Sequence, residues 1–272
     1  MYKKGQVTIF MIIGILILII LGSFFFTRSY LEEKRIETEA EIIQQEIKMS
    51  DPVKQYIESC LDSTSKKALL FVGKHGGYYE LPSQSDAFFL MPYYFYDNKS
   101  YLISKKELEM QISNYINHEL FFCVKNFVFF EEHGYDIKQE DVNTSTIIAK
   151  NKVILNLNFP VTLAKGDSVQ NIFEFTTSIN SRLGTVYEVI TELLEEQEND
   201  PSSICVSCGA ILGIEHDLRI EMNFIEEGEM MFTIVDENIP IDQEPFIYNY
   251  INKYKFEEFS NSSHISESDE ES

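Results

Sequence analysis

Four cysteines are the residues whose spacing most directly suggests chemistry, and two of them form the sequence Cys205-Val-Ser-Cys208. Such a pair can act as a redox dithiol, supply half of the ligands of a zinc site, or form a local disulfide. A redox pair favours a helix start after a strand and nearby basic residues, but no basic residue flanks this pair. A zinc site needs two more ligands, and there is no second Cys-x-x-Cys. All three interpretations stay open, with a structural role favoured.

The other two cysteines, Cys60 and Cys123, fall at comparable positions on two predicted amphipathic helices. In an oxidising compartment, a disulfide between them would join the helices and close a loop of about 60 residues. Loop closure of this size stabilises a fold by roughly 4 kcal/mol. In a reducing compartment they would be two buried thiols, since cysteine is common in protein cores. The choice depends on where the chain resides.

Other catalytic patterns are absent from the sequence. The five histidines show no metal-binding spacing, and the chain has no G-x-S-x-G, G-x-G-x-x-G or phosphate-binding loop. We therefore expect no enzymatic activity, no cofactor, and no catalytic or metal-binding residue.

Three Asn-x-Ser/Thr sequences, at Asn98, Asn143 and Asn261, are candidate N-glycan acceptors. Chance alone would give about two such sequences at this asparagine content. They are compatible with a position outside the cell without establishing it.

The charge balance bears on the partners that the chain can bind. With 44 acidic and 22 basic residues, the net charge is −22. This charge repels phosphates, so we expect no nucleic-acid binding and no docking of the soluble part on anionic lipid headgroups.

The segments that must position these residues begin with an apolar run, Val7–Phe26, which contains no charged residue. As a helix its 20 residues would span about 30 Å, which is the thickness of the hydrocarbon core of a bilayer. A cleaved export signal has a shorter apolar core and ends in small residues, whereas this run ends in three phenylalanines. We predict a retained transmembrane helix that contacts the lipid bilayer.

The orientation of this span is less well defined by charge. Lys3 and Lys4 precede it, and Arg28, Lys34 and Arg35 follow it closely. The numbers of basic residues on the two sides of the span are nearly equal. Because Lys3 and Lys4 lie close to the apolar segment, we favour an orientation with the amino terminus inside the cell.

The opening sequence KKGQVTIF resembles the class III signal peptides of archaeal pilins and archaellins. The resemblance implies cleavage after Gly5, which would leave Gln6 as the first residue of the mature chain. The pilin pattern has Glu at the fifth mature position, where this chain has Phe10. In pilins that Glu is thought to pair with a neighbouring subunit's amino terminus, so this departure affects filament assembly more than cleavage.

The wider chain also resembles uncharacterised single-span membrane proteins of small-genome (DPANN-type) archaea. The similar segments include VKQYIESCLDSTSKKALLFVGKHGGYYELP, EMQISNYINHELFFCVKNF and INSRLGTVYEVITELLEE, and together with shorter ones they cover nearly the whole chain. This resemblance implies an architecture and a location and transfers no catalytic residue.

The sequence pattern predicts an α+β fold after the transmembrane segment, residues 1–28. We expect a stalk helix over 29–51, broken at Asp51-Pro52, and then an extracytoplasmic body over 52–256. The body should begin with a pair of amphipathic helices, about 53–71 and 105–130, with an irregular aromatic segment between them.

A mainly antiparallel sheet with additional helices should follow this helical pair. Residues 145–179 read as three strands, 184–197 and 202–214 as helices, 218–236 as a hairpin and 244–256 as a last strand. Residues 257–272 hold six acids and neither Lys nor Arg, which is typical of a disordered tail.

Three functional hypotheses follow from these features. The first is a single-pass membrane protein of the cell surface, with a structural role or an envelope or surface protein as its partner. The alternative is a type IV pilin-like filament subunit processed after Gly5. The third is a thiol-redox enzyme that uses Cys205 and Cys208.

Overall fold

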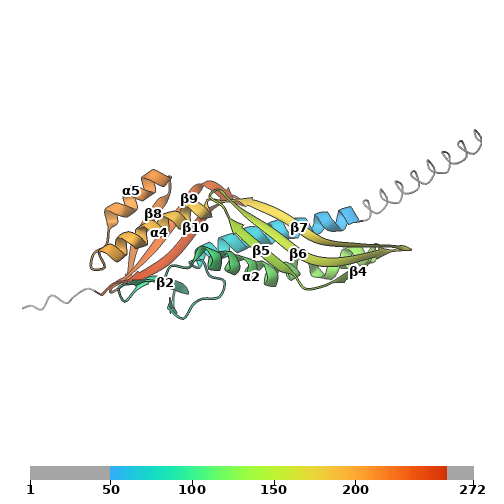
Figure 1. The fold of residues 1–272 in the computed structure, drawn as a ribbon, viewed down its shortest axis with the longest axis horizontal. Helices are drawn as coiled ribbons and strands as arrows, with labels where there is room; N and C mark the ends of the chain where they lie inside the picture. The colour runs from blue at the N-terminus through green and yellow to red at the C-terminus, as the bar shows by residue number, and fades with distance from the viewer. Residues whose placement is uncertain (1–49, 256–272) are drawn as a thin grey trace, which may run out of the picture.

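The computed structural model describes residues 50–255, which form an α+β body. The predicted span Val7–Phe26, residues 29–49 of the predicted stalk, the candidate processing residues Gly5 and Gln6, and the tail with Asn261 lie outside the described residues. The body is elongated, and its first and last described residues lie toward opposite ends of the long axis (Figure 1).

The first described element is a helix over residues 50–74. The other helices, with one short 3-10 turn called η1, are α2 (Lys105–Val124), η1 (Lys125–Phe127), α3 (Val128–Glu132), α4 (Leu183–Asn199) and α5 (Val206–His216). The strands are β1 (Ser85–Asp86), β2 (Met91–Tyr96), β3 (Lys99–Ser100), β4 (Asp136–Gln139), β5 (Asn143–Ile148), β6 (Lys152–Lys165), β7 (Ser168–Asn180), β8 (Arg219–Glu226), β9 (Glu229–Ile241) and β10 (Glu244–Lys253).

One sheet is built around the long strand β6, which pairs with β7 along one edge and with β4 and β5 in succession along the other. All of these pairings are antiparallel. The pairing of β6 with β7 shifts register between Asn158 and Val161, where Pro160 cannot donate a backbone hydrogen bond. Val153, Leu155 and Leu157 of β6 are buried, and Asn156 and Asn158 are exposed, so one face of the sheet is packed and the other is open to solvent.

The second sheet has the strand order β1-β2-β10-β9-β8, with β3 added beside β2. Its strands are antiparallel except for β2 and β10, which run parallel. Tight turns join the strands: Asp97 and Asn98 between β2 and β3, and Asp242 and Gln243 between β9 and β10, all have positive φ, as type I′ hairpin turns require.

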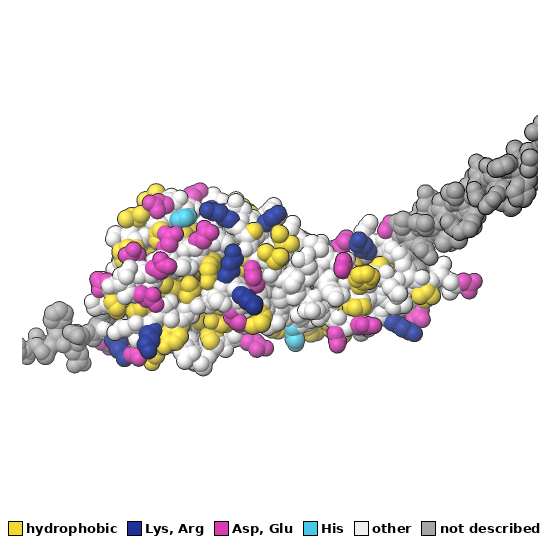
Figure 2. Space-filling view, viewed as in Figure 1, with side chains coloured by type: hydrophobic (Ala, Val, Ile, Leu, Met, Phe, Trp, Pro, Cys, Tyr) yellow, Lys and Arg dark blue, Asp and Glu magenta, His cyan; other side chains and the backbone are white. Residues whose placement is uncertain are grey.

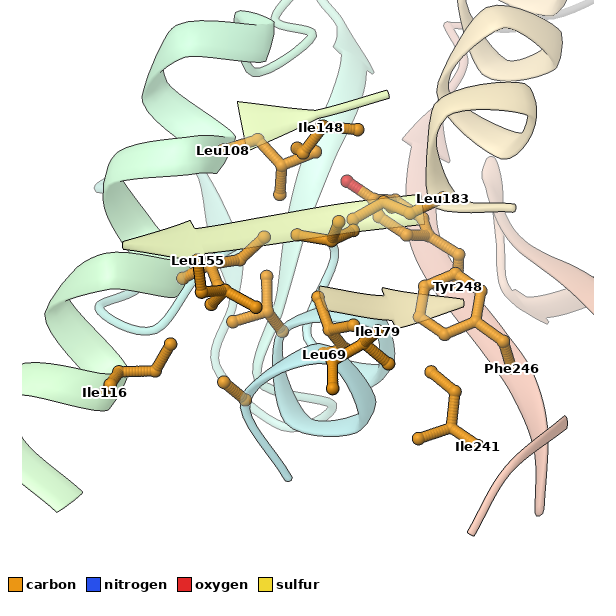
Figure 3. Close-up of a cluster of buried hydrophobic side chains, with 14 of the residues drawn as sticks. Leu69, Leu108, Ile116, Ile148, Leu155, Ile179, Leu183, Ile241, Phe246 and Tyr248 are labelled. Atoms are coloured by element: carbon orange, nitrogen blue, oxygen red, sulfur yellow. The ribbon is translucent and has the colours of Figure 1, made fainter. Parts of the chain in front are cut away.

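Helices cover the packed faces of both sheets, and one hydrophobic core joins them. The helix over 50–74 and α2 lie along the β5-β6-β7 sheet, and α4 and α5 lie at the other end of the body with β8–β10 (Figure 1). The close-up shows this shared core (Figure 3). It contains Leu69, Leu108 and Leu155 from the end with the β5-β6-β7 sheet, and Leu183, Phe246 and Tyr248 from the end with β8–β10. The body is therefore a single packed unit and not two separate domains.

Several predicted elements are confirmed. The structure contains the three strands predicted over 145–179 and the helix predicted over 184–197, which is α4. It also contains the predicted hairpin, formed by β8 and β9 with Gly228 in its turn, and the predicted last strand, β10. The start of the helix predicted from about residue 105 is also confirmed: Ser104 caps α2, and its side chain accepts a hydrogen bond from the backbone N–H of Glu107.

Other predictions need correction. Ser50 and Asp51 are already helical, so Asp51 is not an N-cap and the predicted break between stalk and body does not lie there. α2 ends at Val124 and not near residue 130, because Lys125 and Phe127 adopt left-handed backbone conformations that interrupt the helix. The aromatic segment predicted to be irregular contains β1–β3.

Candidate functional site

Cys60 and Cys123 form a disulfide between the helix over 50–74 and α2, with their Cα atoms 5.6 Å apart. Cys60 is buried in the core. Next to the disulfide, the Tyr56 hydroxyl donates a hydrogen bond of 2.7 Å to the backbone oxygen of Cys123. The predicted pairing is confirmed, and its surroundings are those of a structural link between two helices.

Cys205 and Cys208 form a second disulfide, with Cα atoms 5.3 Å apart, at the start of α5. Cys205 is the N-cap of this helix, and its sulfur accepts a 3.2 Å hydrogen bond from the backbone N–H of Cys208. The predicted helix over 202–214 therefore begins too early. The loop after Asp200-Pro201 continues to Cys205, and α5 begins only at Val206, so the sequence pattern did not reveal the Cys205 cap.

A hollow of about 490 Å³ opens beside the second disulfide. Cys205 lines it together with Val206, Ser207 and residues from the end of α4 and the following loop, including Glu196 and Asp200. Hydrogen bonds from the Ser203 and Ser202 hydroxyls lower the pKa of Asp200, so its carboxylate is charged at neutral pH. The hollow therefore places the half-buried Cys205 beside negative charge.

The two cysteines of this disulfide differ in their surroundings. Cys205 lines the hollow, whereas Cys208 packs against the hydrophobic core. The neighbouring surface of α5 is apolar, since Val206 is 63% exposed and Ile214 is 83% exposed.

The candidate glycan acceptors Asn98 and Asn143 are both exposed. Asn98 lies in the turn between β2 and β3, and Asn143 begins β5. Asn261 falls outside the described residues.

Asn143 also borders a polar hollow on the open face of the first sheet. The hollow has a volume of about 390 Å³ and is lined by Asn143, Ser145, Asn156, Leu157, Asn158, Glu174 and Thr176. The Thr176 hydroxyl donates a 3.1 Å hydrogen bond to the Asn156 side-chain oxygen across the β6–β7 pair. The sequence does not indicate this site, because its residues come from three strands and meet only through the strand register.

Two buried acids have basic partners. The Arg182 guanidinium lies 3.1 Å from Asp236, and the Lys253 ammonium lies 2.5 Å from Glu229. Tyr93 also donates a 3.0 Å hydrogen bond to Glu229. The first contact joins the start of α4 to β9, and the other two join β9 to β10 and β2. Both acids therefore have a structural role.

Among residues 50–255, no three Cys, His, Asp or Glu side chains are grouped as a metal site would require. Two histidines bond to the backbone one turn earlier: His75 Nδ1 lies 2.8 Å from the Phe71 oxygen, and His133 Nδ1 lies 2.7 Å from the Phe129 oxygen. His264 lies outside this range.

No helix within residues 50–255 is both long and apolar enough to cross a bilayer. The surface of the body is acidic: Asp and Glu side chains are spread along its length and outnumber Lys and Arg on the face shown (Figure 2). Searches against protein-family models, curated proteins and solved structures find no match for this chain.

Proposed function

We propose that this chain is a membrane-anchored protein of the cell surface, with a structural or partner-binding role. The apolar run Val7–Phe26 would act as the anchor, and the acidic body would stand outside the membrane. An envelope or surface protein would be its partner.

The observation that carries this proposal is that both disulfides together use all four cysteines of the chain. Structural disulfides persist in oxidising environments outside the cytosol and are rare within it. The Cys60–Cys123 disulfide, which links two helices through the buried Cys60, therefore argues against a cytosolic location.

The position of the first described residue also supports the proposal. Residue 50 lies toward one end of the long axis (Figure 1), so a tether attached there would leave the two hollows and the far end of the body accessible to partners. The acidic surface would keep the body away from anionic lipid headgroups.

Labelling of intact cells with a membrane-impermeant, amine-reactive reagent tests this proposal. Lys99, Lys152 and Lys165 are exposed on the body and should be labelled, whereas Lys3 and Lys4 precede the span and should react only after lysis. Body lysines that remain unlabelled until lysis would place the body inside and overturn the proposal.

A pilin-like filament subunit is the second candidate. It is favoured by the resemblance of KKGQVTIF to class III signal peptides, which implies cleavage after Gly5. The intact mass of the protein from native membranes separates the two: loss of residues 1–5 together with filaments in micrographs supports the pilin-like candidate, and a full-length chain excludes it.

A further inference from the structure

The two disulfides of this chain differ in what they contribute to the fold. Cys60–Cys123 joins a buried to a half-buried cysteine and has a sequence separation of 63, whereas Cys205–Cys208 has a separation of 3. Loop-closure entropy gives the long loop about 4 kcal/mol and the short one about 2 kcal/mol. The short disulfide also borders an open hollow, so stability alone is a weak explanation for its position.

We propose that Cys205–Cys208 is a thiol-exchange site that oxidises a cysteine pair of a partner protein, with Cys205 as the sulfur that the partner attacks. This inference goes beyond a structural or binding role. It rests on the contrast between the two sulfurs, since Cys205 lines the hollow and Cys208 packs against the core.

The geometry also stabilises the product of exchange. When the disulfide opens, a thiolate on Cys205 would keep the backbone N–H of Cys208 as a hydrogen-bond donor, at the positive end of α5. This hydrogen bond and the helix end oppose the repulsion from the Glu196 and Asp200 carboxylates that line the same hollow. A thiolate stabilised by them is a better leaving group, which speeds the step that releases the partner.

The reaction balances in two steps. A partner thiolate attacks the Cys205 sulfur, the Cys205–Cys208 bond breaks, and its electron pair goes to Cys208, which takes a proton from water. The partner's second thiolate then attacks the partner sulfur of the mixed disulfide and expels Cys205 as the thiolate. The partner thus transfers two electrons to the Cys205–Cys208 pair. Its two thiol protons pass to water, from which Cys208 takes one, and Cys205 ends as the thiolate. A low-molecular-weight disulfide would restore the oxidised pair.

The charge of the hollow indicates which partner it accepts. Glu196 and the charged Asp200 line it, and Val206 adds an apolar surface beside Cys205. A thiolate carried by an acidic segment would be repelled, and one flanked by Lys or Arg would be attracted. We infer that the partner segment is basic around its cysteines.

The test uses the purified full-length protein in detergent and two synthetic peptides that each carry two cysteines, one with lysines and the other with glutamates beside them. The wild-type protein should oxidise one equivalent of the lysine peptide, which mass spectrometry detects as the loss of two hydrogens. It should do so at least about tenfold faster than for the glutamate peptide at low salt, with the ratio falling as salt rises. Equal rates would overturn the charge preference.

Matched variants separate this site from the other disulfide. The double variant Cys205→Ser/Cys208→Ser should oxidise neither peptide, although it keeps Cys60–Cys123. Oxidation that persists in this variant, or wild-type protein that leaves both peptides reduced, would overturn the proposal.

The two single variants test which sulfur reacts. Cys208→Ser leaves the Cys205 thiol, and Cys205→Ser leaves the Cys208 thiol, so their rates with the uncharged aromatic disulfide 4,4′-dithiodipyridine can be compared. Cys208→Ser should react about tenfold faster or more, because its thiol borders the hollow and receives the N–H bond. A faster reaction of Cys205→Ser would refute the assignment of Cys205.

Discussion

Removal of the Cys60–Cys123 disulfide should destabilise the body far more than removal of Cys205–Cys208. The perturbation is a pair of double variants, Cys60→Ala/Cys123→Ala and Cys205→Ala/Cys208→Ala. Both remove two sulfurs and one covalent link, so the comparison isolates where in the fold the link lies.

The expected magnitudes follow from loop length and burial. The sequence separations of 63 and 3 correspond to about 4 and about 2 kcal/mol of loop-closure entropy. Truncation of the buried Cys60 side chain adds about 1 kcal/mol, because the core around it can only partly collapse. We therefore expect losses of about 5 kcal/mol for the first variant and about 2 kcal/mol for the second.

Pulse proteolysis of the full chain in a urea series measures both losses under the same conditions. A brief exposure to protease digests only unfolded molecules, so the urea midpoint of the surviving band reports the free energy of unfolding. The single variant Cys60→Ala is the control, since it also breaks the disulfide and should lie within about 1 kcal/mol of its double variant.

Equal losses for the two double variants would refute this reasoning. A larger loss for Cys205→Ala/Cys208→Ala would go further, because it would assign the structural role to the short-loop disulfide.

Three other predictions concern a close approach, a buried ion pair and a buried tyrosine. A Cβ added to Gly77 would lie 2.5 Å from the Tyr248 hydroxyl oxygen, whereas Gly166, also at positive φ, has no atom within 4 Å; in urea unfolding, Gly77→Ala should cost at least about 2 kcal/mol more than Gly166→Ala, and a smaller difference would contradict the packing argument. Replacement of Arg182 by Met leaves the fully buried Asp236 without its counter-charge, so a loss of about 3–5 kcal/mol is expected in the same assay, and a neutral result would show that the pair is dispensable. Burial raises the pKa of Tyr254 from 10.0 to about 12, so the unfolded chain loses this proton first as the pH rises. The free energy of unfolding should therefore fall between pH 10 and about pH 12. Tyr254→Phe should reduce the slope of the unfolding free energy against pH by up to about 1.4 kcal/mol per pH unit in this range, and an unchanged slope would contradict the role of Tyr254.

Elements with strong local patterns could be predicted from the sequence. The alternation of Val153, Leu155 and Leu157 with polar residues identified β6, and the Ser104 cap identified the start of α2. The pairing of Cys60 with Cys123 was also accessible, because both cysteines fall on the inward faces of predicted helices.

Features that depend on distant partners could not be predicted. β2 runs parallel to β10, which lies about 150 residues later in the chain, and Pro92 within β2 opposes a helix but does not indicate a strand. The end of α2 depends on left-handed residues such as Lys125, which carry no sequence signal of the kind that glycine gives. The polar hollow around Asn156 exists only through the register of three strands.

The thiol state of Cys60 and Cys123 in the native cell tests the central claim most directly. Cells are quenched in acid, free thiols are alkylated, and the cysteine peptides from the membrane and soluble fractions are analysed by mass spectrometry. An extracytoplasmic anchored body predicts that the protein is found with the membranes and that these two cysteines remain unalkylated and linked. Protein in the soluble cytosolic fraction with both cysteines alkylated would contradict it.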